Sequence, residues 1–135
     1  IILAREGARL LDFGIARAIA LSGGPKLTRA GIAVGTANYM SPEQIAASPD
    51  LDHRTDVYSV GCVLYECLAG RAPFDDRRDA AILDGHVNRP APDLRTVVPA
   101  VPDRYAEVVA RALRKIPGER WATALDMLQA LGSER

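Results

Sequence analysis

The chain lacks most of the features that mark a specialised class of protein. Two cysteines among 135 residues exclude a disulfide-rich secreted scaffold, which needs several cross-linked pairs. Basic and acidic side chains are equal in number, 17 of each, so the charge balance favours neither nucleic acid nor an anionic membrane as a partner. The longest apolar run, residues 57–68, contains Glu66 and is shorter than the roughly 20 residues that span a bilayer. We therefore expect no membrane segment, and the start of the chain predicts no signal peptide.

Both cysteines lie in that apolar run, five positions apart. On a helix this spacing puts Cys62 and Cys67 on different faces, where the geometry for a disulfide is poor. No Cys-x-x-Cys motif or histidine cluster suggests a metal site. We expect two buried free thiols in a reducing cytosol.

Glycine and proline divide the chain into a small β element and a larger helical part. Residues 1–13 predict two short strands around a hairpin turn at 5–7. Residues 20–37 have no periodicity and contain several Gly, Ser and Thr, so they predict a long surface loop. The proline-rich stretch 89–102 predicts a connecting loop. The expected fold class is mainly α, with about five helices in the segments 41–48, 53–70, 75–87, 103–115 and 122–131.

Residues at the ends of two expected helices fit known capping preferences. Ser41 is the expected N-cap of its helix, with a proline directly after it and Glu43 in the first turn. The next helix is expected to have Thr55 or Asp56 as its cap and to end at Gly70.

Apolar side chains predict which helix faces are buried. In 53–70 they cover a wide arc, typical of a central helix surrounded by others: Val57, Val60, Val63, Leu64, Cys67 and Leu68. In 103–115 they form one stripe: Tyr105, Val108, Val109, Ala112 and Leu113. In the last helix three leucines are expected to point inward: Leu125, Leu128 and Leu131.

Four short motifs follow one another along the chain. They are DFG at 12–14, GTANYMSPE at 35–43, DVYSVG at 56–61 and PGERW at 117–121. Their order and spacing resemble the C-terminal lobe of eukaryotic-type serine/threonine protein kinases, in particular the bacterial ones. The resemblance covers essentially the whole of 1–135, and it implies an α+β protein-kinase-like fold of which this chain is a partial C-terminal lobe.

The resemblance assigns the DFG motif to the nucleotide. It implies that Asp12 holds Mg²⁺ against the phosphates of ATP, with Phe13 and Gly14 completing the cofactor-binding motif. Oxygen ligands at a fixed position suit this hard cation, and the end of a strand provides a fixed position. Taken alone, Asp12 could instead cap a turn at the end of the strand.

Residues 15–40 resemble the activation segment of these kinases. Thr28 is the favoured phosphorylation site over Ser22, because it lies nearer the Gly-Thr pair that precedes Ala37. A phosphate would add nearly two negative charges and could order the loop against arginine side chains, whereas the alternative is a solvated hydroxyl. The resemblance gives Thr36 a catalytic role in positioning the substrate hydroxyl, with a turn threonine as the alternative.

Three further residues are implied to be structural. Glu43 and Arg120 are expected to form a partly buried, bidentate ion pair that tethers the activation segment to the last helices. Asp56 is expected either to accept hydrogen bonds from the backbone of the catalytic loop or to cap its own helix.

The tryptophan and the two histidines indicate less about function. Trp121 is expected in the core beside Arg120, with a partner for its indole N–H. His53 and His86 are isolated in the sequence, so surface or capping roles are expected for both.

Several parts of a complete kinase do not occur in residues 1–135: the Gly-rich loop, the strand lysine with its helix glutamate, and the catalytic loop with its base. The parent protein is expected to transfer the γ-phosphate of ATP to Ser and Thr hydroxyls of protein substrates. This chain alone is expected to be inactive. An apolar surface left uncovered by the absent part also predicts poor solubility of the isolated chain.

A non-catalytic alternative stays open, in the form of a pseudokinase or a truncated interaction module. The intact Asp12 speaks against a pseudokinase but does not bear on truncation. The residues directly before Ile1 would decide between the two functions. A kinase domain of this kind is expected in the cytoplasm, while a membrane anchor and the oligomeric state of the parent stay open.

Overall fold

The computed structural model describes residues 2–4, 7–9 and 37–132. The chain divides into two compact units, 1–30 and 31–135. In the first unit, strands β1 (Ile2–Ala4) and β2 (Gly7–Arg9) pair antiparallel, with Ile2 opposite Arg9. Most of the predicted long loop at 20–37 lies outside the described residues.

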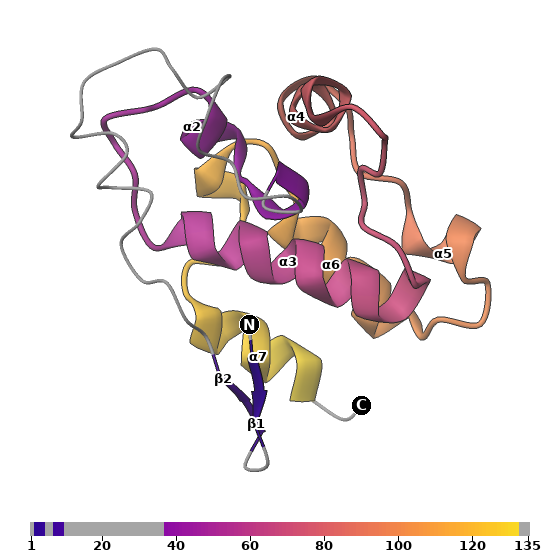
Figure 1. Cartoon of the computed structure of the whole chain (residues 1–135). Coiled ribbons are helices and arrows are strands. Elements are labelled where there is room, and N and C mark those ends of the chain that lie inside the picture. Colours follow the sequence, from indigo (N-terminus) through magenta and orange to yellow (C-terminus); the bar gives the residue numbers. More distant parts are fainter. Residues whose placement is uncertain (1, 5–6, 10–36, 133–135) are drawn as a thin grey trace. The chain divides into compact units, whose positions relative to one another are not determined.

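The second unit is built from helices (Figure 1). In chain order its described elements are η1 (Ala37–Tyr39), α2 (Pro42–Ile45), α3 (Arg54–Ala69), α4 (Asp79–Asn88), α5 (Leu94–Val97), α6 (Asp103–Ala112), η2 (Pro117–Glu119) and α7 (Ala124–Gly132). Helix α5 lies within the stretch 89–102 that the prolines had predicted to be a loop only, so that prediction was wrong. Asp93 explains the extra helix, because its carboxylate accepts a hydrogen bond from the N–H of Arg95 and caps the short turn.

Helix α2 begins as the sequence predicted. The Ser41 hydroxyl accepts a hydrogen bond from the N–H of Gln44, and the Gln44 side chain accepts one from the N–H of Ser41. This reciprocal arrangement is a capping box, and it satisfies two N–H groups that a helix start leaves unpaired.

The long helix α3 ends as predicted but starts differently. Gly70 follows its last residue with a φ of 74°, a left-handed conformation that glycine adopts without steric cost. Neither Thr55 nor Asp56 is the N-cap, because the helix already begins at Arg54, after His53. Thr55 is buried in the first turn and Asp56 is exposed there.

Helix α3 is central, and α6 runs alongside it (Figure 1). Its inner face buries Tyr58, Cys62 and Tyr65 against α5 and α6. Gly61 allows the close approach of α6, because a Cβ atom at this position would lie 2.8 Å from the Cβ of Ala112. Both cysteines are free, but only Cys62 is buried, so the predicted burial of Cys67 was wrong. Cys67 lies on the far side of the helix from Cys62, as its spacing had indicated.

The last helix is turned relative to the expected orientation. Met127 is buried, whereas Leu125 and Leu128 have 60% and 63% of their surface exposed, so their predicted inward position was wrong. The packed stripe is Met127, Ala130 and Leu131, which has the i, i+3, i+4 spacing of one helix face. Counting leucines alone had selected the neighbouring face. No helix in the described part of the chain combines the length and apolar content that crossing a membrane requires.

Candidate functional site

The residues expected to act on the nucleotide or the substrate hydroxyl lie outside the described residues, as do the two expected phosphorylation sites: Asp12, Phe13, Gly14, Ser22, Thr28 and Thr36. The description begins at Ala37, directly after Thr36. It includes the three residues with an expected structural role, and two of these three meet in one polar cluster.

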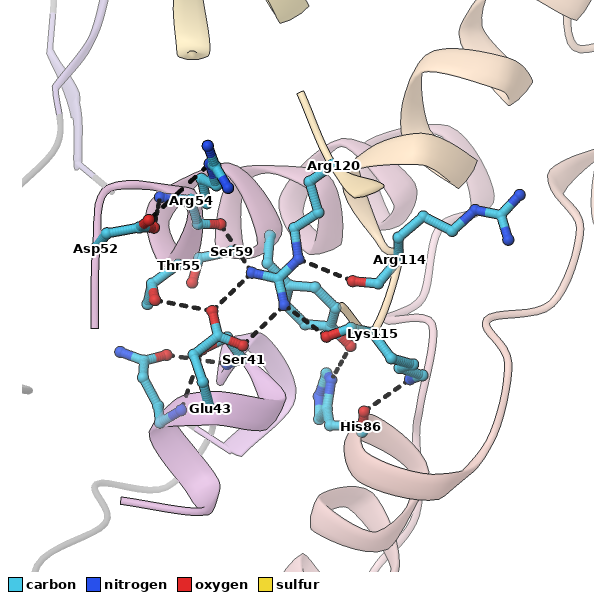
Figure 2. Close-up of polar contacts among 12 residues, drawn as sticks. Ser41, Glu43, Asp52, Arg54, Thr55, Ser59, His86, Arg114, Lys115 and Arg120 are labelled. Atoms are coloured by element: carbon cyan, nitrogen blue, oxygen red, sulfur yellow. Dashed lines mark hydrogen bonds and ion pairs between the residues drawn. The ribbon is translucent and has the colours of Figure 1, made fainter. Parts of the chain in front are cut away.

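Glu43 and Arg120 come together although 77 positions separate them (Figure 2). Arg120 donates from Nη1 to Glu43 Oε1 at 2.6 Å and from Nη2 to Glu43 Oε2 at 2.7 Å. The two parallel bonds form the bidentate arrangement that fits a guanidinium to a carboxylate. The Arg120 side chain is fully buried and 11% of the Glu43 side chain is exposed, so water barely screens this pair.

Arg120 also binds three backbone carbonyl groups. It donates from Nε to Arg114 O at 2.8 Å, from Nη1 to Arg54 O at 2.9 Å and from Nη2 to Lys115 O at 3.0 Å (Figure 2). With the two bonds to Glu43, all five N–H groups of the guanidinium have an acceptor. The guanidinium carbon lies 4.9 Å from the ring centre of Tyr58 on α3. One side chain therefore joins α2, the start of α3 and the segment after α6.

Glu43 has a second side-chain partner that the sequence analysis did not identify. The Thr55 hydroxyl donates to Glu43 Oε1 at 2.8 Å. Burial alone would raise the pKa of Glu43, but the hydrogen bonds from Arg120, with those from Thr55 and the backbone, outweigh it and hold the pKa below its usual value. The carboxylate is thus kept charged. The only sign of the Thr55 contact in the sequence was a hydroxyl residue near the start of a helix.

The segment in front of α2 is fixed to α3 by hydrogen bonds of its own. The Ser59 hydroxyl donates to the carbonyl oxygen of Tyr39 at 2.8 Å. The Tyr39 hydroxyl donates to Glu66, and this bond, with burial, raises the pKa of Tyr39 to about 12. Ala37 is buried beside Phe74 and Ile82. Residues 37–43 are therefore held along their whole length, and we call them the anchored segment.

The structure also shows where three other residues named in the sequence analysis lie. Asp56 is exposed and is not joined to the Glu43–Arg120 pair. Trp121 is partly buried and packs against a core cluster that includes Val108 of α6, and its indole N–H has the expected partner, because it donates to Val108 O at 3.1 Å. His53 is exposed, as expected, and its Nε2 lies 2.6 Å from Ala122 O.

His86 is not a surface residue, so that prediction was wrong. It is fully buried on α4, with Nδ1 2.8 Å from the hydroxyl oxygen of Tyr58. Lys115 was not singled out in the sequence at all, yet its Nζ donates to Gly85 O at 3.1 Å and His86 O at 2.7 Å. Burial lowers the pKa of Lys115 to about 8. These positions depend on contacts of α4 with Tyr58 and Lys115, which are distant in the sequence, and no local pattern signals them.

The described cluster holds structure in place. In residues 37–132 and the two short strands, no three His, Cys, Asp or Glu side chains gather in a way that could bind a metal ion. The Cys62 thiol is unreactive, because burial raises its pKa to about 12. What the arrangement can do is fix the anchored segment, whose first residue follows Thr36 directly.

Comparison with known proteins identifies the family that this chain matches. Residues 1–131 match the protein kinase domain family. Serine/threonine-protein kinase PknB of Mycolicibacterium smegmatis is 43% identical over 123 residues, which are 90% of this chain and 19% of the relative. Serine/threonine-protein kinase PknE of Mycobacterium tuberculosis is 38% identical over 130 residues, 96% of this chain and 22% of the relative. The chain thus spans about a fifth of the length of these curated relatives.

A solved structure agrees on the fold. The twitchin kinase region from C. elegans superimposes with a TM-score of 0.62 and covers 74% of this chain and 17% of its own. At 24% sequence identity this similarity concerns the fold alone.

Proposed function

This chain belongs to the protein kinase domain family, and we propose that it forms part of the C-terminal lobe of an enzyme that transfers the γ-phosphate of ATP to Ser and Thr hydroxyls of proteins. The observation that carries the proposal is the ordered match of residues 1–131 to this family, together with relatives that are named serine/threonine-protein kinases. The proposed location is the cytoplasm, and the proposed partners are protein substrates.

Asp12 is the proposed magnesium ligand. Its carboxylate has the hard oxygen atoms that Mg²⁺ prefers, and Phe13 and Gly14 complete the proposed cofactor-binding motif. ATP supplies the phosphoryl group when bound, and Mg²⁺ offsets the negative charge that builds up on it. The part of this chain in that reaction is to hold the metal through Asp12.

Thr36 is the proposed positioning residue for the substrate hydroxyl. It precedes the anchored segment, which the Glu43–Arg120 pair and the bonds of Tyr39 hold against α3. Transfer to a hydroxyl needs the reacting atoms within about 3–3.5 Å of each other, so small displacements of the substrate are costly. The proposed role of the Glu43–Arg120 pair is to keep this part of the substrate site from moving.

Thr28 is the proposed regulatory phosphorylation site, with Ser22 as the second candidate. Mass spectrometry of the active full-length protein is expected to find phosphate on Thr28. An active protein with Thr28 unmodified would contradict this assignment.

The chain alone is proposed to be inactive, because the base and the nucleotide-binding lysine of a kinase do not occur in it. The experiment compares the chain with the full-length protein, using radiolabelled ATP, Mg²⁺ and casein, followed by identification of the labelled amino acids. We expect labelled serine and threonine with the full-length protein and no label with the chain. No label with either, while the full-length protein is folded, would favour the non-catalytic interaction module instead.

A further inference from the structure

His86 is a buried titratable side chain that the anchor described above does not use. It lies on α4 (Figure 2), has no exposed surface and contacts two aromatic rings. The ring of Phe74 meets it edge-on with 4.9 Å between centres, and the ring of Tyr58 does so at 5.7 Å. A buried polar ring destabilises the fold unless its nitrogen atoms are hydrogen-bonded.

The two ring nitrogens face different parts of the chain. Nδ1 lies 2.8 Å from the Tyr58 hydroxyl oxygen. Nε2 is buried and has no hydrogen-bond partner among the described residues. The backbone of Ala37 and Asn38, which belong to η1, lies near the ring. In the tautomer with the ring proton on Nε2, Nδ1 can accept a hydrogen bond from the Tyr58 hydroxyl.

The partner of His86 is part of the anchor. The Tyr58 ring lies under the guanidinium of Arg120, which binds Glu43. His86 thus contacts the anchored segment at two places, directly beside Ala37 and indirectly through Tyr58 and Arg120. It belongs to α4, so it connects that helix to the segment.

The charges around the ring oppose its protonation. Lys115 approaches from the segment after α6, with its Nζ 4.6 Å from the Phe74 ring centre and its bond to the carbonyl of His86. Arg89 at the end of α4 lies over Phe74, and Arg120 lies over Tyr58. On α3 the Cys62 thiol is neutral. The nearby carboxylate of Glu43 is already paired with Arg120.

We propose that His86, as a neutral ring, is a positioning residue that sets the anchored segment for binding of the protein substrate through Tyr58 and Arg120. This inference rests on the proposed kinase function. Burial, with a smaller contribution from Lys115, lowers the pKa of His86 to about 4, which agrees with a ring that stays neutral.

The test uses the full-length protein with casein as the substrate, and it measures KM and kcat for casein and for ATP separately. We expect His86→Leu to raise KM for casein about tenfold and to change KM for ATP less than twofold. Tyr58→Phe should have the same effect. In the double variant, KM for casein should be no higher than in the more impaired of the two single variants. His86→Asn, whose amide can accept the bond from Tyr58, should recover most of the loss. The matched control is His53→Asn, an exposed histidine, which should behave like the wild type.

Other results would overturn the inference: equal shifts in both KM values, effects of the two substitutions that multiply, or no recovery with His86→Asn. If the wild-type protein transfers no phosphate, the proposed function fails, and hydrogen exchange of the same variants decides the inference. Faster exchange confined to residues 37–45 in His86→Leu and Tyr58→Phe would support it. Exchange that is unchanged, or faster throughout the protein, would refute it.

Discussion

Replacing Arg120 by methionine isolates the contribution of the anchor. The change keeps much of the apolar stem but removes all five donors, so the Glu43 carboxylate, 11% exposed, loses its charge partner. Removing one partner of a buried ion pair costs about 3–5 kcal/mol, because the remaining charge is left in a site of low polarity. For a domain of roughly 150–250 residues this corresponds to a decrease in melting temperature of about 10 °C.

The assay is urea unfolding of the domain that contains this chain, for Arg120→Met, Glu43→Gln and the double variant. Because the two side chains bind each other directly, the double variant should lose at least 2 kcal/mol less than the sum of the single losses, roughly the coupling expected for contacting residues. Arg114→Met is the matched control, since this neighbouring arginine is exposed and should change stability by less than about 0.5 kcal/mol. Additive losses, or an equal loss in the control, would refute the reasoning.

Three further results follow from the described packing. Lowering the pH from 7 to 5 should reduce the free energy of unfolding by about 2 kcal/mol through His86 alone. The pKa of His86 is about 4 in the folded state and about 6.5 in the unfolded state. The contribution of His86 to stability is therefore complete above pH 6.5 and declines below it. Urea titrations should show a smaller decline in His86→Asn, and an identical decline would contradict the assignment. Gly61→Ala should cost about 1–3 kcal/mol, measured by thermal unfolding, because its Cβ would lie 2.8 Å from that of Ala112; an unchanged melting temperature would show that the helices can separate freely. Met127→Ala should cost about 2–5 kcal/mol and Leu128→Ala less than about 0.5 kcal/mol in the same assay, and the reverse order would restore the leucine face as the buried one.

Local signals in the sequence were sufficient for features that depend on a few neighbouring residues. The capping box at Ser41 and the end of α3 at Gly70 are of this kind, because capping and a positive φ are decided within one turn. The amphipathic stripe of α6 was also readable, since its buried residues repeat at helical spacing. The meeting of Glu43 with Arg120 was different, because it came from family resemblance and no spacing rule links residues 77 positions apart.

Features that depend on tertiary packing were not predictable. The burial of His86 depends on the rings of Phe74 and Tyr58 that contact it, and these come from two other parts of the chain. The orientation of α7 was misjudged because the prediction followed the leucines alone, whereas the face that packs against the core is Met127 with Ala130 and Leu131. In both cases the deciding partners are distant in sequence.

Asp12→Ala in the full-length protein tests most directly the proposal that Asp12 is the metal ligand of a serine/threonine kinase. The measurement is the rate of phosphate transfer from ATP to casein at saturating Mg²⁺, with thermal unfolding to show that the variant is folded. If Asp12 holds Mg²⁺, transfer should fall at least a thousandfold while the melting temperature stays close to that of the wild type. A folded variant that phosphorylates casein at the wild-type rate would contradict the proposed role of Asp12.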